Sequence, residues 1–223
     1  MKSIYLNELK FGNPTQTQLE IINSQNYLEN ILELNNFPPP NNDSIVTIQE
    51  LNVITENLEK ISMHHNSDKL IKFLEIDTNL KSNIVNHFKE LFDFDFTDLV
   101  ENISQDIEPL ILKLKYYYNR PRPNQLASIL KLKLAPLNQS VTPSYPSSHT
   151  LLTEILMRVI DIKHPELEEQ TKLITQVVSD SRVFLGLNYP SDNDFSTEIA
   201  QLIVSEKSFK IKYNISDIKI NEE

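Results

Sequence analysis

Apolar residues recur at helical spacing along most of this chain, and this period limits its fold more than any other feature. Side chains three or four positions apart share one face of a helix, so such runs predict amphipathic helices. One helix each is expected over 19–34, 48–58, 99–118, 125–130, 148–162, 165–187 and 192–204, and one or two over 70–92. The predicted fold class is all-α.

The chain length suits one domain, and 1–223 is expected to form a single all-helical unit. Residues 1–40 are expected to supply an N-terminal helix and a proline-rich linker that pack on the core. Near the other end, 209–213 and 218–220 alternate apolar and polar side chains, which is the period of a strand. We therefore expect 207–223 to be an extended arm.

The formal net charge of −10 bears on partners. An acidic chain is repelled by nucleic acid and by anionic membranes, so any bound anion needs a local basic pocket. The N-terminal residues lack a signal-peptide pattern, and no run approaches the ~18 apolar residues of a membrane span. We expect a cytoplasmic protein, or a virion component if the gene comes from a phage.

A first segment, 113–123, gathers four cations where a helix runs into a proline-stiffened turn: Lys113, Lys115, Arg120 and Arg122. Arginine presents a planar fork that matches phosphate oxygens, and lysine adds a compact charge. Alternatively, these cations only complement the C-terminal dipole of the helix and stay solvated.

A second segment, Pro146-Ser147-Ser148-His149, leads directly into a helix. A helix N-terminus presents free N–H groups that can bind an anion, and Ser147 adds a hydroxyl donor. His149 has the chemistry of a proton donor to a leaving group. The alternative is an ordinary helix cap with an incidental histidine.

A third segment contains Ser181, Arg182, Asn188 and Asp192. Arg182 falls inside an otherwise apolar helix, where a cation should be exposed or paired with an anion. The partner could be a ligand or another side chain of the protein.

In this order and spacing the three segments resemble the signature of the type 2 phosphatidic acid phosphatase and vanadium haloperoxidase superfamily. That signature is Lys, six residues, Arg-Pro; then Pro-Ser-Gly-His; then Ser-Arg, five residues, His, three residues, Asp. Lys113 with Arg120 and Lys115 with Arg122 both fit the first part. The second pair is preferred, because soluble bacterial class A nonspecific acid phosphatases carry a similar Tyr-x-Arg-x-Arg-Pro run.

The resemblance implies a helical bundle of the acid phosphatase type whose helix ends surround one anion pocket. It implies phosphate ligands at Lys115, Arg122, Ser147, Ser148 and Arg182. It further implies that His149 is the acid and that Asp192 orients the residue at position 188. Two positions depart from the signature: Ser148 replaces the glycine, and Asn188 replaces the nucleophilic histidine.

An amide nitrogen has no lone pair available for attack on phosphorus, so Asn188 removes the covalent step. We expect phosphate or a small phosphomonoester to bind, with hydrolysis weak or lost, and we expect no metal or cofactor, vanadate included. Two alternatives stay open: a catalytically silent structural or interaction module, viral for example, and an engineered His-to-Asn variant of an active acid phosphatase. By analogy with the family, the chain is also a candidate homo-oligomer.

Overall fold

The computed structural model of the chain describes residues 3–24, 28, 37–64 and 67–215. Within these ranges every regular element is a helix, which confirms the predicted all-α class. The helices are α1 (Ser3–Glu8), α2 (Gln16–Ile22), α3 (Ile45–His64), α4 (Ser67–Thr78), α5 (Leu80–Phe92), α6 (Thr97–Tyr118), α7 (Pro123–Leu130), α8 (Ser148–Lys163), α9 (Glu168–Phe184), α10 (Pro190–Ser205) and α11 (Lys207–Tyr213), with a short 3₁₀ helix at Pro165–Leu167.

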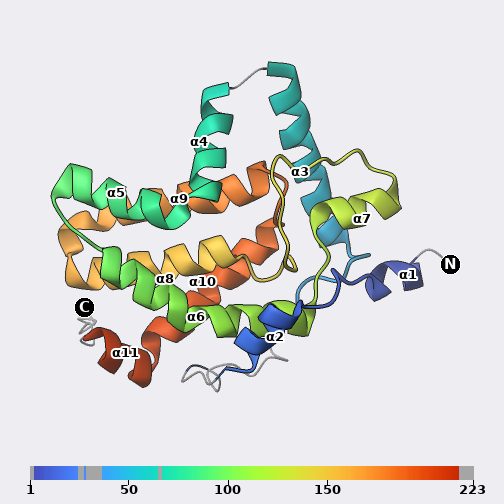
Figure 1. The fold of residues 1–223 in the computed structure, drawn as a ribbon. Coiled ribbons are helices and arrows are strands. Elements are labelled where there is room, and N and C mark those ends of the chain that lie inside the picture. The colour runs from blue at the N-terminus through green and yellow to red at the C-terminus, as the bar shows by residue number, and fades with distance from the viewer. Residues whose placement is uncertain (1–2, 25–27, 29–36, 65–66, 216–223) are drawn as a thin grey trace, which may run out of the picture.

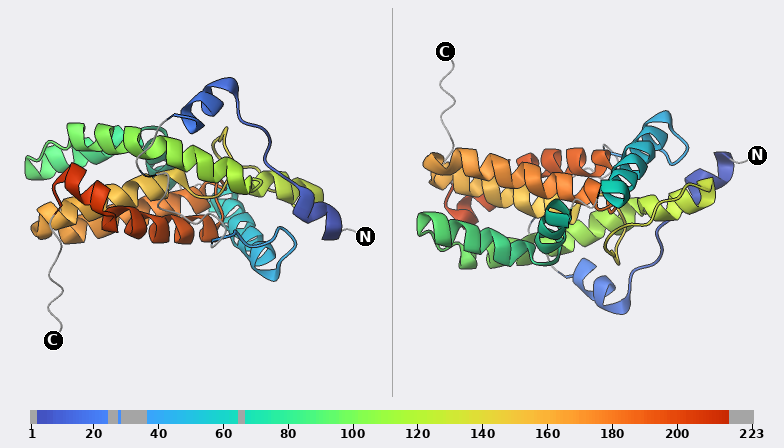
Figure 2. Two further views of the ribbon diagram at one scale, coloured as in Figure 1. Left: turned by 90° about the horizontal axis from the view of Figure 1, so that it is seen from below. Right: turned by 90° about the horizontal axis from the view of Figure 1, so that it is seen from above.

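Helix α8 lies at the centre of the bundle and packs against α6, α9 and α10 (Figures 1 and 2). Its side chains are buried on nearly every side, and Leu151, Ile155, Leu156, Val159 and Ile160 are all fully buried. Packing against these neighbours is what mainly stabilises a helix buried to this extent. The end of α6 and the start of α10 lie at the N-terminus of α8, where Lys115 donates to Pro146 O at 2.6 Å and Ser147 N donates to Asp192 O at 3.2 Å.

Helices α3 and α4 form an arm that projects from the bundle at the top of Figure 1 and packs on α9. Phe73 of α4 meets Phe184 of α9 edge to face, with ring centroids 4.8 Å apart. This contact positions the C-terminal end of α4 beside α9, where Asp77 becomes part of the site described below.

The predicted extended arm at 207–223 is wrong for its first part, because Lys207–Tyr213 is helix α11. Phe209 and Tyr213 are four residues apart and both buried, whereas Ile211 between them is 70% exposed. An i, i+4 pair lies on one helical face, so burying these two rings favours the helix over a strand. Residues 216–223 lie outside the described ranges.

The N-terminal prediction is partly revised. The expected helix at 19–34 is α2 at Gln16–Ile22, preceded by the separate α1, and 25–27 and 29–36 lie outside the described residues. Helix α2 packs on α6. The start of the proline linker also contacts the core, since the ring of Phe37 lies 5.5 Å from that of Phe195.

Candidate functional site

The last turn of α6 carries Lys115 into the interior. Lys115 is 1% exposed, and its ammonium group donates to the carbonyl oxygens of Pro143 and Pro146 at 2.7 and 2.6 Å. Lys113 is only half-buried on another side of the helix. The lysine of the preferred register is thus the one that faces the second segment.

The turn after α6 directs Arg122 toward the third segment. Asn119 ends the helix in the left-handed conformation, with φ at 51°. Arg122 then donates to Asn188 Oδ1 at 3.1 Å and to Leu187 O at 2.6 Å. Lys115 and Arg122 are therefore brought to the same buried region as the third segment.

Arg120 has a different environment. Its guanidinium donates to Asp192 Oδ1 at 2.7 Å and to Glu50 Oε2 at 3.1 Å, and its side chain is 1% exposed. The face of the guanidinium lies 3.9 Å from the centre of the Tyr189 ring. Arg120 thus joins α3 to α10, and the sequence contained no local sign of Glu50 as its partner.

The second segment caps α8. Ser147 is the N-cap residue, and its buried hydroxyl accepts from Thr150 N. This contact is the one expected if the segment is an ordinary helix cap. Ser148 is the first residue of the helix and adopts right-handed helical geometry. Only a left-handed conformation would favour glycine there, so a serine side chain is accommodated without backbone strain.

Gly186 makes the turn that returns the chain to Arg182. Its φ of +72° suits glycine, and an added Cβ would lie 3.1 Å from Leu58 Cδ1. After this turn the backbone N–H groups of Leu187 and Asn188 both donate to Arg182 O, at 3.0 and 3.2 Å. The side chains of Arg182 and Asn188 consequently face each other.

Asn188 lies at the centre of the cluster and is 1% exposed. Its Oδ1 accepts from both Arg122 and Arg182, each at 3.1 Å. Its Nδ2 donates to Asp192 Oδ2 at 3.0 Å and to Ser144 O at 2.7 Å. An amide thus bridges two guanidinium groups and a carboxylate with neutral donor and acceptor atoms.

Burial sets the electrostatics of the cluster. Desolvation lowers the pKa of Arg122 to about 10 and that of Arg182 to about 9. It also holds the pKa of Lys115 well below its usual range, and the nearby Arg122 charge adds to this. Buried cations in such surroundings are stabilised by an anion, which makes the cluster a candidate oxyanion site.

Asp77 is a component of the site that the sequence motifs do not reveal. It belongs to the last turn of α4, and its carboxylate forms a buried ion pair with Arg182. A negative charge at a helix C-terminus is unfavourable, because it faces the negative end of the helix dipole. That placement is the one sequence signal that could have pointed to a compensating cation.

His149 follows the N-cap of α8 and lies beside Asp77. Its Nε2 donates to Asp77 O at 3.0 Å and is 3.6 Å from Asp77 Oδ1, with 28% of the side chain exposed. Burial, with smaller effects from the Lys115 and Arg122 charges, lowers the pKa of His149 from 6.5 to about 4. The imidazole is therefore neutral at pH 7 in the unliganded protein.

This pKa predicts a pH effect on stability. The folded-state pKa of His149 is lower than the unfolded value, so protonation favours unfolding. The contribution of His149 to the free energy of unfolding is complete above pH 6.5 and is lost as the pH falls toward 4. Wild type should lose about 2 kcal/mol more than His149→Gln over that range, after allowance for partial exposure. Urea unfolding at several pH values measures this difference. The same pH dependence of the unfolding free energy in wild type and variant would contradict the prediction.

A cavity of about 590 Å³ opens beside His149, between α5, α6 and the start of α8. Its lining includes Asp77, Thr142, Ser148 and His149, together with apolar and charged side chains of α5 and α6. Lys115, Arg122 and Arg182 are not among the described residues that line it. The cavity has room for an organic group next to His149.

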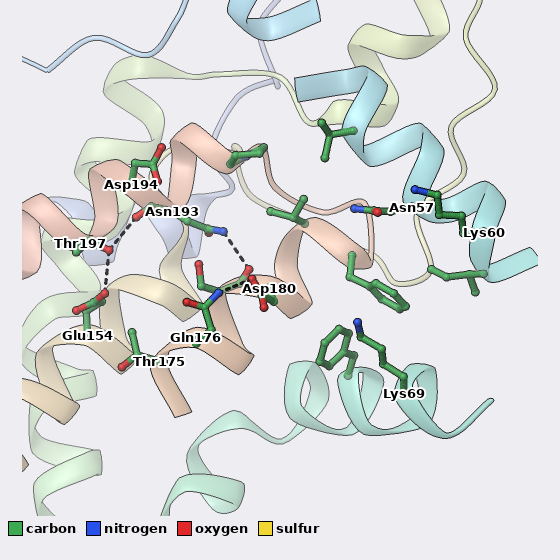
Figure 3. Close-up of a pocket in the computed structure, with 17 residues that line it drawn as sticks. Asn57, Lys60, Lys69, Glu154, Thr175, Gln176, Asp180, Asn193, Asp194 and Thr197 are labelled. Carbon is green, nitrogen blue, oxygen red and sulfur yellow. Dashed lines mark hydrogen bonds between the residues drawn. The ribbon is translucent and has the colours of Figure 1, made fainter. Parts of the chain in front are cut away.

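A larger cavity of about 900 Å³ lies outside the motif region, between α3, α4, α9 and α10 (Figure 3). Some of its polar side chains form hydrogen bonds with one another. Thr197 donates to Glu154 Oε1 at 2.8 Å, and Gln176 donates to Asp180 Oδ1 at 2.8 Å. Lys69 lies over the Phe184 ring at 4.9 Å. None of the motif residues is among the described residues that line this cavity.

Of the helices in the described part of the chain, none combines the length and the apolar character needed to cross a membrane.

Comparison with known proteins found similarity among solved structures. No protein-family model and no curated protein matches the chain. Among solved structures, the chain is similar to a transmembrane PAP2-type phosphatidylglycerolphosphate phosphatase from Bacillus subtilis. The sequence identity is 18%, the match covers 70% of this chain and 81% of that chain, and the TM-score is 0.42.

Proposed function

We propose that this chain binds phosphate or a small phosphomonoester on a scaffold of the type 2 phosphatidic acid phosphatase superfamily, with hydrolysis weak or lost. The observation that carries the proposal is that Arg122 and Arg182 both donate to the buried side chain of Asn188. Lys115 adjoins them, since its ammonium group and Asn188 Nδ2 both contact Ser144 O, at 3.5 and 2.7 Å. Clustered arginine forks and a lysine match the charge and geometry of a phosphoryl group. The same cations would stabilise charge on its equatorial oxygens.

The other residues of the site have supporting roles in this proposal. The N–H of Ser148 at the start of α8 supplies a further donor, and Ser147 holds that turn through its cap. His149 adjoins the cavity that would receive the organic group of an ester. A bound phosphate raises the pKa of this imidazole through its negative charge, which favours the protonated form. The chemistry needs no metal or cofactor.

The loss of the covalent step follows from the chemistry of Asn188. Its nitrogen is already a donor to Asp192 and to Ser144, and amide resonance removes its basicity. What remains is a preorganised cationic pocket in which slow attack by water is the available route. Binding should therefore outlast catalysis.

Substitution of Arg182 tests the proposal. Arg182→Lys keeps the charge but loses the fork, and it should weaken the binding of inorganic phosphate by about tenfold. Arg182→Ala should weaken it further, because the charge is also removed. Isothermal titration calorimetry at pH 7 gives the dissociation constants.

Arg158→Ala is the matched control, since Arg158 forms a partly exposed pair with Glu154 on α8 away from the cluster. It should bind phosphate as the wild type does. Equal affinity in wild type and both Arg182 variants, with circular dichroism unchanged, would contradict the proposal. Wild-type hydrolysis of an aryl phosphate about a hundredfold faster than Arg182→Ala would contradict the loss of catalysis.

A silent structural or interaction module is the second candidate, and a specific observation favours it. Asn188 Oδ1 accepts from two arginines, and Asp77 pairs with Arg182, so the cluster has internal acceptors without a ligand. In that case, phosphate at millimolar concentration would neither bind nor raise the melting temperature.

A further inference from the structure

Asp77 is held in the site by three separate parts of the fold. Its carboxylate pairs with Arg182 of α9, and its Oδ2 accepts from Asn138 Nδ2 at 2.6 Å. Its backbone carbonyl accepts from His149 Nε2 at 3.0 Å. The side chain is 5% exposed. One residue therefore engages both the guanidinium and the imidazole that the proposed function assigns to a phosphate ester.

A carboxylate on a guanidinium uses the same donors and the same charge complementarity as a phosphate oxygen. Asp77 and an oxyanion cannot both occupy the Arg182 donor that Asp77 now takes. The contact to His149 has a similar effect, because the Nε2–H that donates to Asp77 O is not free to donate to a leaving group. In this state the end of α4 blocks two functions of the site at once.

The position of Asp77 relative to the cavity adds an independent observation. Asp77 and His149 both line the 590 Å³ cavity, whereas Arg182, on the other side of the carboxylate, is not among its described lining residues. Asp77 therefore lies between the open space and the buried guanidinium. A ligand that enters through this cavity meets Asp77 before it meets Arg182.

We propose that Asp77 is a built-in competitor of the anion site, and that an oxyanion binds by displacing its carboxylate from Arg182. This inference rests on the proposed function and adds an internal inhibitor to it. The closed state has Asp77 on Arg182 and His149. The open state has the oxyanion in its place and the C-terminal turn of α4 moved away.

The test compares phosphate binding to full-length wild type, Asp77→Asn, Asp77→Ala and Glu75→Gln by isothermal titration calorimetry. Glu75 is an exposed carboxylate in the same helix, so Glu75→Gln makes the same charge change away from the site. Both Asp77 variants should bind inorganic phosphate at least about tenfold tighter than wild type, because a charged competitor is removed. Glu75→Gln should stay within about twofold of wild type.

Thermal unfolding supplies a second measurement, since either Asp77 variant leaves Arg182 without its buried carboxylate partner. Both should be less stable than wild type without ligand, and phosphate should raise their melting temperatures more than that of wild type. If wild type binds phosphate and the Asp77 variants bind it equally or more weakly, Asp77 positions Arg182 instead of competing with the anion. That result refutes the competition and leaves the phosphate site standing. If neither wild type nor the variants bind, the phosphate site and its competitor are refuted together.

Discussion

Asn188→His should convert the protein into a phosphatase, with turnover of an aryl phosphate raised by at least about a hundredfold over wild type. Asn188 Nδ2 already donates to Asp192 Oδ2 at 3.0 Å, so an imidazole Nδ1–H in its place has the same orienting carboxylate. The free Nε2 lone pair then attacks phosphorus, and the ester P–O bond breaks. His149 donates a proton to the departing oxygen, and water hydrolyses the phosphohistidine.

Two further variants separate nucleophilic chemistry from a change of size. Asn188→Gln enlarges the side chain without adding a basic nitrogen and should remain inactive. His149→Gln in the Asn188→His background should lose most of the gained activity, because the proton donor is removed. A folded, phosphate-binding Asn188→His protein with wild-type turnover would show that more than the missing imidazole prevents catalysis.

Asp192→Ala should destabilise the protein by about 3 to 5 kcal/mol, the largest stability effect expected here. Asp192 is fully buried, pairs with Arg120 at 2.7 Å, and accepts from Asn188 Nδ2 at 3.0 Å and Tyr189 N at 2.9 Å. It also accepts from the hydroxyl of Ser144. Alanine leaves these buried donors without their carboxylate acceptor. It also removes one of the two carboxylates that Arg120 contacts.

Urea denaturation of wild type and variant measures this difference. Asp194→Ala, two residues along the same helix and exposed, is the matched control and should change the unfolding free energy by less than about 0.5 kcal/mol. A cost below about 1 kcal/mol for Asp192→Ala would mean that the Arg120 network contributes little.

The helices were the most predictable part of the molecule. The expected helices at 99–118 and 148–162 correspond closely to α6 and α8, because apolar period and capping residues act within a few positions of each other. The same local reasoning was wrong for α11. Its short alternating run fits a strand, but the run also places two aromatic rings four residues apart, which fits one face of a helix. The burial of Phe209 and Tyr213 decided between the two.

The candidate site was predictable only in part. The motifs singled out Lys115, Arg122, Arg182 and Asn188. In the structure both arginines donate to Asn188, and Lys115 shares the Ser144 carbonyl oxygen with it. No motif includes Asp77 or Glu50, although Asp77 is an acidic residue in the last turn of α4. Their importance depends on contacts such as Arg120 with Glu50, which are 70 positions apart in the chain.

The sequence by itself determined the helical class, the cationic segments and the absence of an imidazole at position 188, because residue identity and local period are sufficient for each. Only the tertiary structure decided which arginine faces Asn188, which one is bound to Asp192, and that Asp77 is paired with Arg182. These outcomes depend on how α6, α9 and α10 pack around α8 and on how α4 packs on α9. Ion pairs form between side chains that packing brings within reach, whatever their separation along the chain.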